Sequence, residues 1–334
     1  MPAIASPRVN PCHLNGFGAA ARNDHMRIVT LLPSATEIVY ALGLEPVGVS
    51  HECDHPPDAA TKPAVNRSRV DAGASSAEID SQVLEADEGE GVYDIDLDTL
   101  DRLDPDLVIS QGICDVCAVD SVLVREAVDE LALDCEVLTT DPHSLGDVFA
   151  DVRRIGDATD TATRADELLA DLEARVDAVA ATAEEADERP RVAVLDWTDP
   201  VMTAGHWVPE LVDLAGGSYD LAEPGDASRP RKWNAIREYD PEVLVVAPCG
   251  FDLEQTAANL ADLTEREGWD DLAAVCRGRA YALDGHQFMN RPGPRLVDSL
   301  EHLAGVVHPE LFDLPPAEAA RPLRMLRGEP PVEP

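Results

Sequence analysis

The 334-residue sequence contains very little lysine. Only Lys62 and Lys232 occur, so arginine supplies nearly all of the 26 cationic side chains, against 65 Asp and Glu and a formal net charge of −39. Acidic residues that extend along a whole chain are typical of a solvated surface, and here they indicate adaptation to molar salt. The longest basic cluster, residues 229–232, is too short to neutralise a row of phosphates, so nucleic acid is not an expected partner.

Long apolar runs are also missing. No stretch approaches the roughly 20 apolar residues that span a membrane, and residues 1–25 have no apolar signal-peptide core. Cys12 lacks the apolar run expected before a lipid-anchored cysteine, and seven cysteines, an odd number, fit a reducing compartment. These features predict a cytoplasmic protein. The alternative is an extracytoplasmic protein whose start is mis-assigned, with Met26 as a candidate first residue and residues 1–25 as a disordered extension.

Sequence motifs for catalysis are absent. The chain has no G-x-S-x-G elbow, no P-loop and no G-x-G-x-x-G turn. We therefore expect a binding protein rather than an enzyme, with no required cofactor.

One local pattern occurs twice. Residues 100–109 read LDRLDPDLVI, and residues 236–245 repeat the pattern as IREYDPEVLV. In each copy an amphipathic helix should stop at Asp-Pro, because proline donates no backbone hydrogen bond and restricts the residue before it. The apolar run that follows is typical of a strand buried on both faces.

The repeat predicts an α/β fold with two Rossmann-like lobes and a ligand cleft between them, since ligands bind beyond the carboxyl ends of parallel strands. Residues 144–188 read as one long, rigid connecting helix. Ser34 and Glu37 have the spacing of a capping box at the start of the first helix. The predicted boundaries are an N-terminal lobe at 26–143, a C-terminal lobe at 189–312 and a loose tail at 313–334.

The strand and helix at 27–38 (RIVTLLPSATEI), the DPDLVI strand and the long connecting helix resemble the substrate-binding proteins for cobalamin and iron–siderophore complexes. The segment 51–57 (HECDHPP) resembles the cobalamin-binding branch. The resemblance covers about residues 27–310. It implies two lobes bridged by a helix, a chelate held between them and delivery to an ABC transporter permease, with the chain acting as a monomer. It also places an acidic permease-docking residue on each lobe. The matching positions are Asp98, which keeps the charge, and Asn234, which does not. The chain is therefore expected to be either the substrate-binding component of an ABC-type cobalamin uptake system or a cytoplasmic corrinoid binder, and the lost charge and missing signal peptide favour the second.

A corrinoid is a flat, partly apolar disc with amide arms and a central cobalt, so its site needs apolar walls and a few polar groups. Imidazole could also coordinate the cobalt. The loops after the predicted strands supply candidates of each kind. The predicted ligand-binding residues are Ser34, Thr36, His51, Cys53, Gln111, Cys114, Trp207, Phe251, His286 and Arg291.

The cysteines support a second hypothesis. Cys114 and Cys117 form a C-x-x-C, and Cys53 and Cys249 lie on loops expected to face the same cleft. Four thiolates could hold zinc or an iron–sulfur cluster, and a C-x-x-C before a helix also suits thiol redox chemistry. A lone C-x-x-C is weak support for either, so unliganded thiols stay open as a third interpretation.

Overall fold

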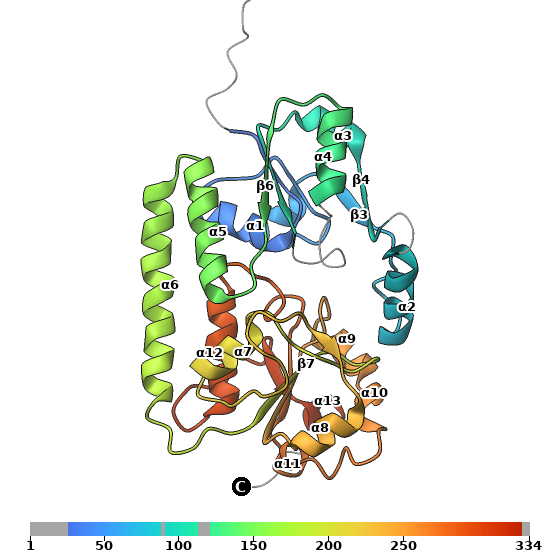
Figure 1. Cartoon of the computed structure of the whole chain (residues 1–334), viewed down its shortest axis with the longest axis vertical. Coiled ribbons are helices and arrows are strands. Elements are labelled where there is room, and N and C mark those ends of the chain that lie inside the picture. The colour runs from blue at the N-terminus through green and yellow to red at the C-terminus, as the bar shows by residue number, and fades with distance from the viewer. Residues whose placement is uncertain (1–25, 88–90, 113–120, 329–334) are drawn as a thin grey trace, which may run out of the picture.

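The computed structural model describes residues 26–87, 91–112 and 121–328, which form two α/β lobes joined by a helix (Figure 1). The two predicted lobes are therefore confirmed. None of the helices in these described ranges is long and apolar enough to cross a membrane.

The N-lobe is built on a parallel sheet with the strand order β2-β1-β5-β6. Its inner strands are buried along their whole length, as expected for a parallel sheet covered on both faces. The strands are β1 (Ile28–Thr30), β2 (Gly48–Val49), β5 (Leu107–Gln111) and β6 (Glu136–Thr140). The helices are α1 (Pro33–Ala41), α3 (Leu97–Leu103), α4 (Ser121–Glu130) and α5 (Leu145–Ala158).

Between β2 and α3 the chain leaves this sheet. The segment contains the short 3-10 helix η1 (Ala59–Thr61) and an antiparallel hairpin of β3 (Asn66–Ser68) and β4 (Tyr93–Ile95). The hairpin carries α2 (Ser76–Asp87), which projects from the N-lobe toward the C-lobe (Figure 1).

The C-lobe has a mixed sheet with the order β12-β11-β10-β7-β8-β9, in which β7, β10 and β11 are parallel. The strands are β7 (Val192–Trp197), β8 (Met202–Thr203), β9 (Arg229–Pro230), β10 (Val243–Val246), β11 (Ala280–Leu283) and β12 (Ala320–Pro322). The helices are α7 (Val208–Leu214), α8 (Trp233–Tyr239), α9 (Leu253–Asn259), α10 (Ala261–Thr264), α11 (Ala273–Cys276), α12 (Leu296–Val307) and α13 (Leu323–Leu326).

The end of the described chain belongs to the C-lobe, so the prediction of a loose tail from residue 313 is wrong there. Strand β12 pairs antiparallel with β11, and Leu323 at the start of α13 is only 2% exposed. The segment is ordered because its few apolar residues are buried against the sheet.

The connecting segment is two helices rather than the one predicted over 144–188. Helix α5 ends at Ala158, Asp160 has a left-handed φ of 56°, and α6 (Ala162–Ala183) returns along α5. Only α6 spans both lobes (Figure 1). A single apolar core runs beside it, from α1 and α5 in the N-lobe to α7 and α12 in the C-lobe, so the lobes share buried surface along this side.

The sequence repeat has a structural counterpart. Helices α3 and α8 both end at an aspartate with left-handed φ, 43° at Asp104 and 44° at Asp240, directly before the proline. In each lobe an arginine at the start of the first strand donates to the carbonyls at that helix end, and we call this contact the arginine brace. Arg27 donates to the carbonyl oxygens of Leu103 and Asp104, and Arg191 to those of Tyr239 and Asp240, at 2.7 to 3.2 Å.

Candidate functional site

The loop after β2 meets the loop after β11 where the lobes face each other. The Asp54 carboxylate accepts hydrogen bonds from Nε2 of His286 at 2.9 Å and from Nη1 of Arg291 at 2.6 Å. Asp54 belongs to the N-lobe and the other two residues to the C-lobe. Two residues predicted to bind ligand, His286 and Arg291, are therefore brought together, at an aspartate that the sequence analysis did not single out.

Glu37 extends this contact into the interior. It is only 4% exposed and accepts hydrogen bonds from Arg295, at 2.6 and 3.0 Å, and from Arg291 at 3.3 Å. Buried charges are stable only when they are paired in this way. We refer to Glu37, Asp54, His286, Arg291 and Arg295 as the interlobe ion cluster.

The predicted capping box of Ser34 and Glu37 is wrong. Helix α1 begins at Pro33 with Leu32 as its N-cap, and no side chain caps it. Ser34 is therefore inside the first turn, where its hydroxyl cannot act as the N-cap. The same spacing does form a capping box at the next α-helix, where Ser75 and Glu78 exchange hydrogen bonds at the start of α2.

The charges in the cluster are set by their neighbours. Burial opposes the charged form of Asp54, but the hydrogen bonds from His286 and Arg291 outweigh it and hold the pKa of Asp54 well below its usual range. The hydrogen bond to Asp54 raises the pKa of His286 above its ordinary value, against the effect of burial. Both partners are therefore favoured in their charged forms at mildly acidic pH.

Thr36 and Cys53 lie in the interior of the N-lobe. The Thr36 hydroxyl lies 2.6 Å from that of Thr30 and 3.0 Å from Sγ of Cys53. Burial raises the pKa of the Cys53 thiol to about 12, so the thiol is protonated in the ligand-free protein.

The four-cysteine site can be followed only in part. Cys114 and Cys117 lie outside the described residues, and Cys249 is half-buried after β10. Within the ranges that the structure describes, no group of three or more His, Cys, Asp or Glu side chains could hold a metal ion. The thiol hypothesis therefore gains no support from the described residues.

His51 points into its own lobe. Its backbone N–H and its ring Nδ1 both lie 3.0 Å from Oδ1 of Asn66, and its Nε2 lies 3.2 Å from Glu52. Glu52 in turn lies 4.0 Å from Nδ1 of His286. His51 therefore reaches the ion cluster only through Glu52, and its role as a ligand-binding residue stays a prediction.

The predicted aromatic walls are buried. Trp207 donates to the Met289 carbonyl at 2.7 Å and is 6% exposed, while Phe251 is 3% exposed and packs on Trp197 with the ring centroids 5.0 Å apart. Ser34 and Gln111 are also buried. In this conformation these side chains line the ends of the central strands with little surface exposed to solvent.

The structure also brings together residues that the sequence analysis missed. The most important are Glu37, Asp54 and Arg295, of which Asp54 lies inside the 51–57 motif. A second interlobe pair is formed by His143 and His206, whose ring centroids are 5.5 Å apart, and His206 has a left-handed φ of 51°. Among these missed residues, only Asp54 could have been found from the sequence, because it lies in the 51–57 motif. A lone Glu, Arg or His on a predicted helix or loop is usually solvated and does not indicate a site.

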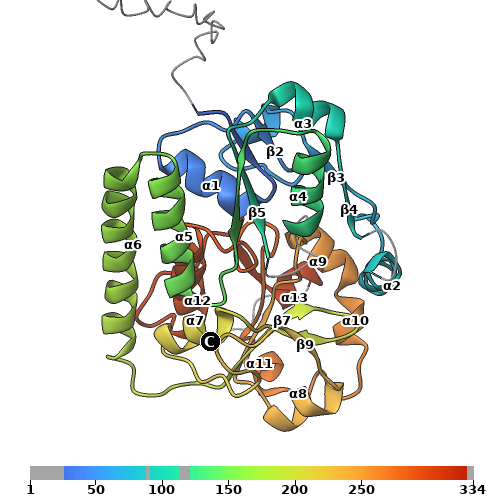
Figure 2. The same ribbon diagram turned by 45° about the horizontal axis from the view of Figure 1, so that its top comes forward.

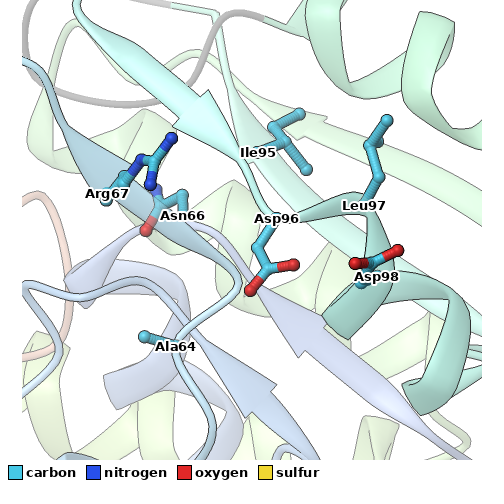
Figure 3. Close-up of a pocket in the computed structure, with 7 residues that line it drawn as sticks. All are labelled: Ala64, Asn66, Arg67, Ile95, Asp96, Leu97 and Asp98. Carbon is cyan, nitrogen blue, oxygen red and sulfur yellow. The ribbon is translucent and has the colours of Figure 1, made fainter.

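The two predicted docking positions are equivalent in the fold. Asp98 and Asn234 are both exposed in the first turn of repeat-related helices, α3 and α8. Asp98 lines a hollow of about 450 Å³ together with Asp96, Asn66 and Arg67 (Figure 3). The N-lobe position is therefore acidic and accessible.

Known proteins share this fold. A periplasmic heme binding protein from Pseudomonas aeruginosa superposes with a TM-score of 0.67 at 20% identity, over 88% of this chain and 96% of that one. The periplasmic vitamin B12 binding protein BtuF of Vibrio cholerae gives 0.61 at 21% identity, over 84% and 96%. In sequence, the uncharacterized ABC transporter substrate-binding lipoprotein YvrC of Bacillus subtilis (strain 168) is 23% identical over 299 residues, covering 87% of this chain and 82% of the relative.

The expected cytoplasmic location is wrong. The family model for periplasmic binding proteins matches residues 28–286, and the B. subtilis relative is named a lipoprotein, so both findings point outside the cytoplasm. The prediction rested on the missing signal-peptide pattern in residues 1–25, and that pattern does not by itself establish where the protein is located. With a match over most of its length and two lobes joined by a helix, the chain belongs to the periplasmic binding protein family.

Proposed function

We propose that this chain binds a cobalamin-type corrinoid, or a related metal chelate, between its lobes and delivers it, as a monomer, to an ABC transporter. The family match and the names of its relatives support binding and delivery rather than catalysis. Chelates differ within this fold, since one neighbour is named for heme and another for vitamin B12. The choice between a corrinoid and heme as the ligand rests on the charges at the interlobe ion cluster.

The pairing of both arginines in that cluster carries the proposal. Glu37 and Asp54 offset the positive charges of Arg291 and Arg295, so both buried guanidiniums are already paired. An anionic ligand, such as the propionates of heme, would have to compete with these carboxylates on a chain of net charge −39. The amide arms of a corrinoid are uncharged and can hydrogen-bond to paired groups without that competition.

Calorimetric titration of reduced, metal-free protein in molar salt tests the proposal. Cyanocobalamin and hydroxocobalamin should bind one-to-one and more tightly than hemin, and His286→Gln or Phe251→Ala should weaken the corrinoid. Tight hemin binding without corrinoid binding would reject the corrinoid while leaving a chelate-binding protein. No binding of any of the three would reject the chelate site.

Delivery is tested at the docking positions. Asp98→Asn should lower the ligand-stimulated ATP hydrolysis of the partner transporter in vesicles without changing the affinity for ligand. Asp101→Asn is the matched control, because Asp101 is exposed on the same helix but lies outside its first turn. Equal activity of the two variants would remove Asp98 from the docking surface. Asn234→Asp tests whether the missing C-lobe charge limits the interaction.

A further inference from the structure

Ser76, at the start of α2, holds the two lobes together on the side opposite α6. Its backbone N–H donates to Oδ1 of Asn259 at 3.0 Å, its hydroxyl donates to the Asp262 carboxylate, and its carbonyl accepts from Nε1 of Trp197 at 3.3 Å. All three partners belong to the C-lobe. Ser76 is fully buried as a result, with 0% of its surface exposed.

A fourth hydrogen bond widens this contact. Nε2 of Gln255 donates to the carbonyl of Ala72, across 183 residues of sequence. The hydroxyl of Thr198 also donates to Asp262, at 2.9 Å, so one C-lobe carboxylate holds a hydroxyl from each lobe. Helix α6 and helix α2 lie on opposite sides of the molecule in both views, so the lobes are connected on these two sides as well as through the interlobe ion cluster (Figures 1 and 2).

The two connections differ in kind. Along α6 the lobes share a continuous apolar core, whereas at α2 the contact is made by hydrogen bonds, with Ile79 as the buried apolar residue of this segment. When such a contact opens, water replaces the lost hydrogen-bond partner. Each of these hydrogen bonds therefore contributes little to the free energy that holds the lobes together. The α2 side is therefore the side on which the lobes can separate, while α6 stays packed.

The contact also adjoins the candidate ligand site. Trp197, which donates to Ser76, packs its ring on Phe251, a predicted ligand-binding residue. Movement of residues 72–76 away from the C-lobe would free one edge of this aromatic pair.

We propose that residues 72–76 and the side chains of Gln255, Asn259 and Asp262 form a detachable interlobe clasp, which must open for ligand to enter or leave and which sets the rate of exchange. The ligand exchanged rests on the proposed function above. The clasp itself is a property of the ligand-free chain and can be tested without any ligand.

The charges around the clasp make it dependent on salt. Asp80 of α2 faces Asp199 of the C-lobe, and burial together with this like charge raises the pKa of Asp80. Asp199 is paired with Arg266 at 3.0 Å. Repulsion between Asp80 and Asp199 is screened as salt rises, so we expect the clasp to open more often in dilute salt than in molar salt.

Hydrogen exchange of the ligand-free protein tests the clasp. Asn259→Ala and Ser76→Ala should speed exchange of the amides of residues 72–79 by roughly tenfold, and lowering the salt should do the same in the wild type. Ser81→Ala is the matched control, because the Ser81 hydroxyl is exposed and bonds to the Ala77 carbonyl of its own helix. Unchanged exchange in both clasp variants would overturn the clasp.

Stopped-flow binding tests the control of exchange. With cyanocobalamin, or with hemin if the chain binds that instead, Ser76→Ala should raise both the association and the dissociation rate constants by about threefold or more, with a smaller change in Kd. A rise in the dissociation rate alone would overturn the proposal, because it would mean lost ligand contact rather than easier opening. Faster amide exchange without binding of either chelate would reject the proposed function and leave the clasp standing.

Discussion

Glu37 shows how much a single residue can determine in this chain. Its carboxylate lies between two guanidiniums from the other lobe, and 3% of its side chain is exposed. In water such a pair contributes little, but in the interior the loss of one partner leaves the others charged and unpaired.

Glu37→Gln should lower the free energy of unfolding by about 3–5 kcal/mol, because Arg295 and Arg291 would then be buried without a full countercharge. Chemical denaturation measures the change. Glu45→Gln is the control, since Glu45 pairs with Lys62 on the surface with 71% of its side chain exposed, and it should cost less than about 1 kcal/mol. Equal small costs at both positions would show that the buried ion pairs do not stabilise the fold.

The contribution of His286 to stability should depend on pH. Since the Asp54 carboxylate raises the pKa of His286, its stabilising effect is complete below the unfolded value of about 6.5 and is lost as the pH rises through the folded value. Asp54, whose pKa is lowered, stays ionised throughout this range. His286→Gln should therefore cost more unfolding free energy at about pH 5.5 than at about pH 9.

His302 provides a control of opposite sign. Burial lowers the pKa of His302, so the folded state resists its protonation and loses stability as the pH falls. His302→Gln should then cost less at low pH than at high pH. If His286→Gln and His302→Gln showed the same pH dependence, the assignment of charge to the ion cluster would be wrong.

Some residues of the interlobe ion cluster could be predicted from the sequence: His286 and Arg291 were named because they follow a predicted strand. Asp54 lies inside the 51–57 segment, yet the sequence could not say which polar residue of that segment faces the other lobe. Glu37 was misread, because its spacing from Ser34 matches a local cap and its partners lie 254 and 258 residues away. Contacts of that range leave no local pattern.

At the scale of elements, the close approach of α5 and α6 depends on Gly156. A β-carbon added there would lie 2.7 Å from Cβ of Ala165, well inside contact distance. Gly156→Ala should cost about 1–3 kcal/mol of unfolding free energy by overpacking. Gly146→Ala on the same helix meets nothing nearer than 3.7 Å and should be neutral or stabilise by up to about 1 kcal/mol. A stabilising effect at both glycines would mean that the helices can move apart freely.

The repeated elements were predictable, and the connecting helix was predictable only in part. The Asp-Pro pairs predict where α3 and α8 end, and the apolar runs that follow them predict strands β5 and β10. Residues 144–188 carry apolar residues at helical spacing on both sides of the turn near Asp160, so periodicity alone joined two helices into one. The left-handed backbone conformation of Asp160 depends on how the two helices pack, and it cannot be read from the amino-acid composition of the segment.

At the scale of the whole molecule, charge governs stability. With a net charge of −39 the folded chain repels itself, and salt shortens the range of that repulsion from about 10 Å at 0.1 M to about 3 Å at 1 M. The free energy of unfolding should rise by at least about 1 kcal/mol between about 0.1 M and about 2 M KCl. Denaturation with urea, which adds no ions, measures this. A stability that is independent of KCl would reject the inferred adaptation to salt.

The arginine brace has a practical consequence for shortened chains. Arg27 lies directly before β1, and its backbone N–H also donates to the Asp106 carboxylate at 2.8 Å, so a chain that begins at Met26 keeps every contact of the first brace. One that begins at Ile28 leaves the carbonyls at the end of α3 without their donor. Arg191 takes the same place in the C-lobe, directly before β7. Each lobe is thus fastened by an arginine directly before its first strand, and removing either arginine leaves the carbonyls at the end of α3 or α8 without this donor.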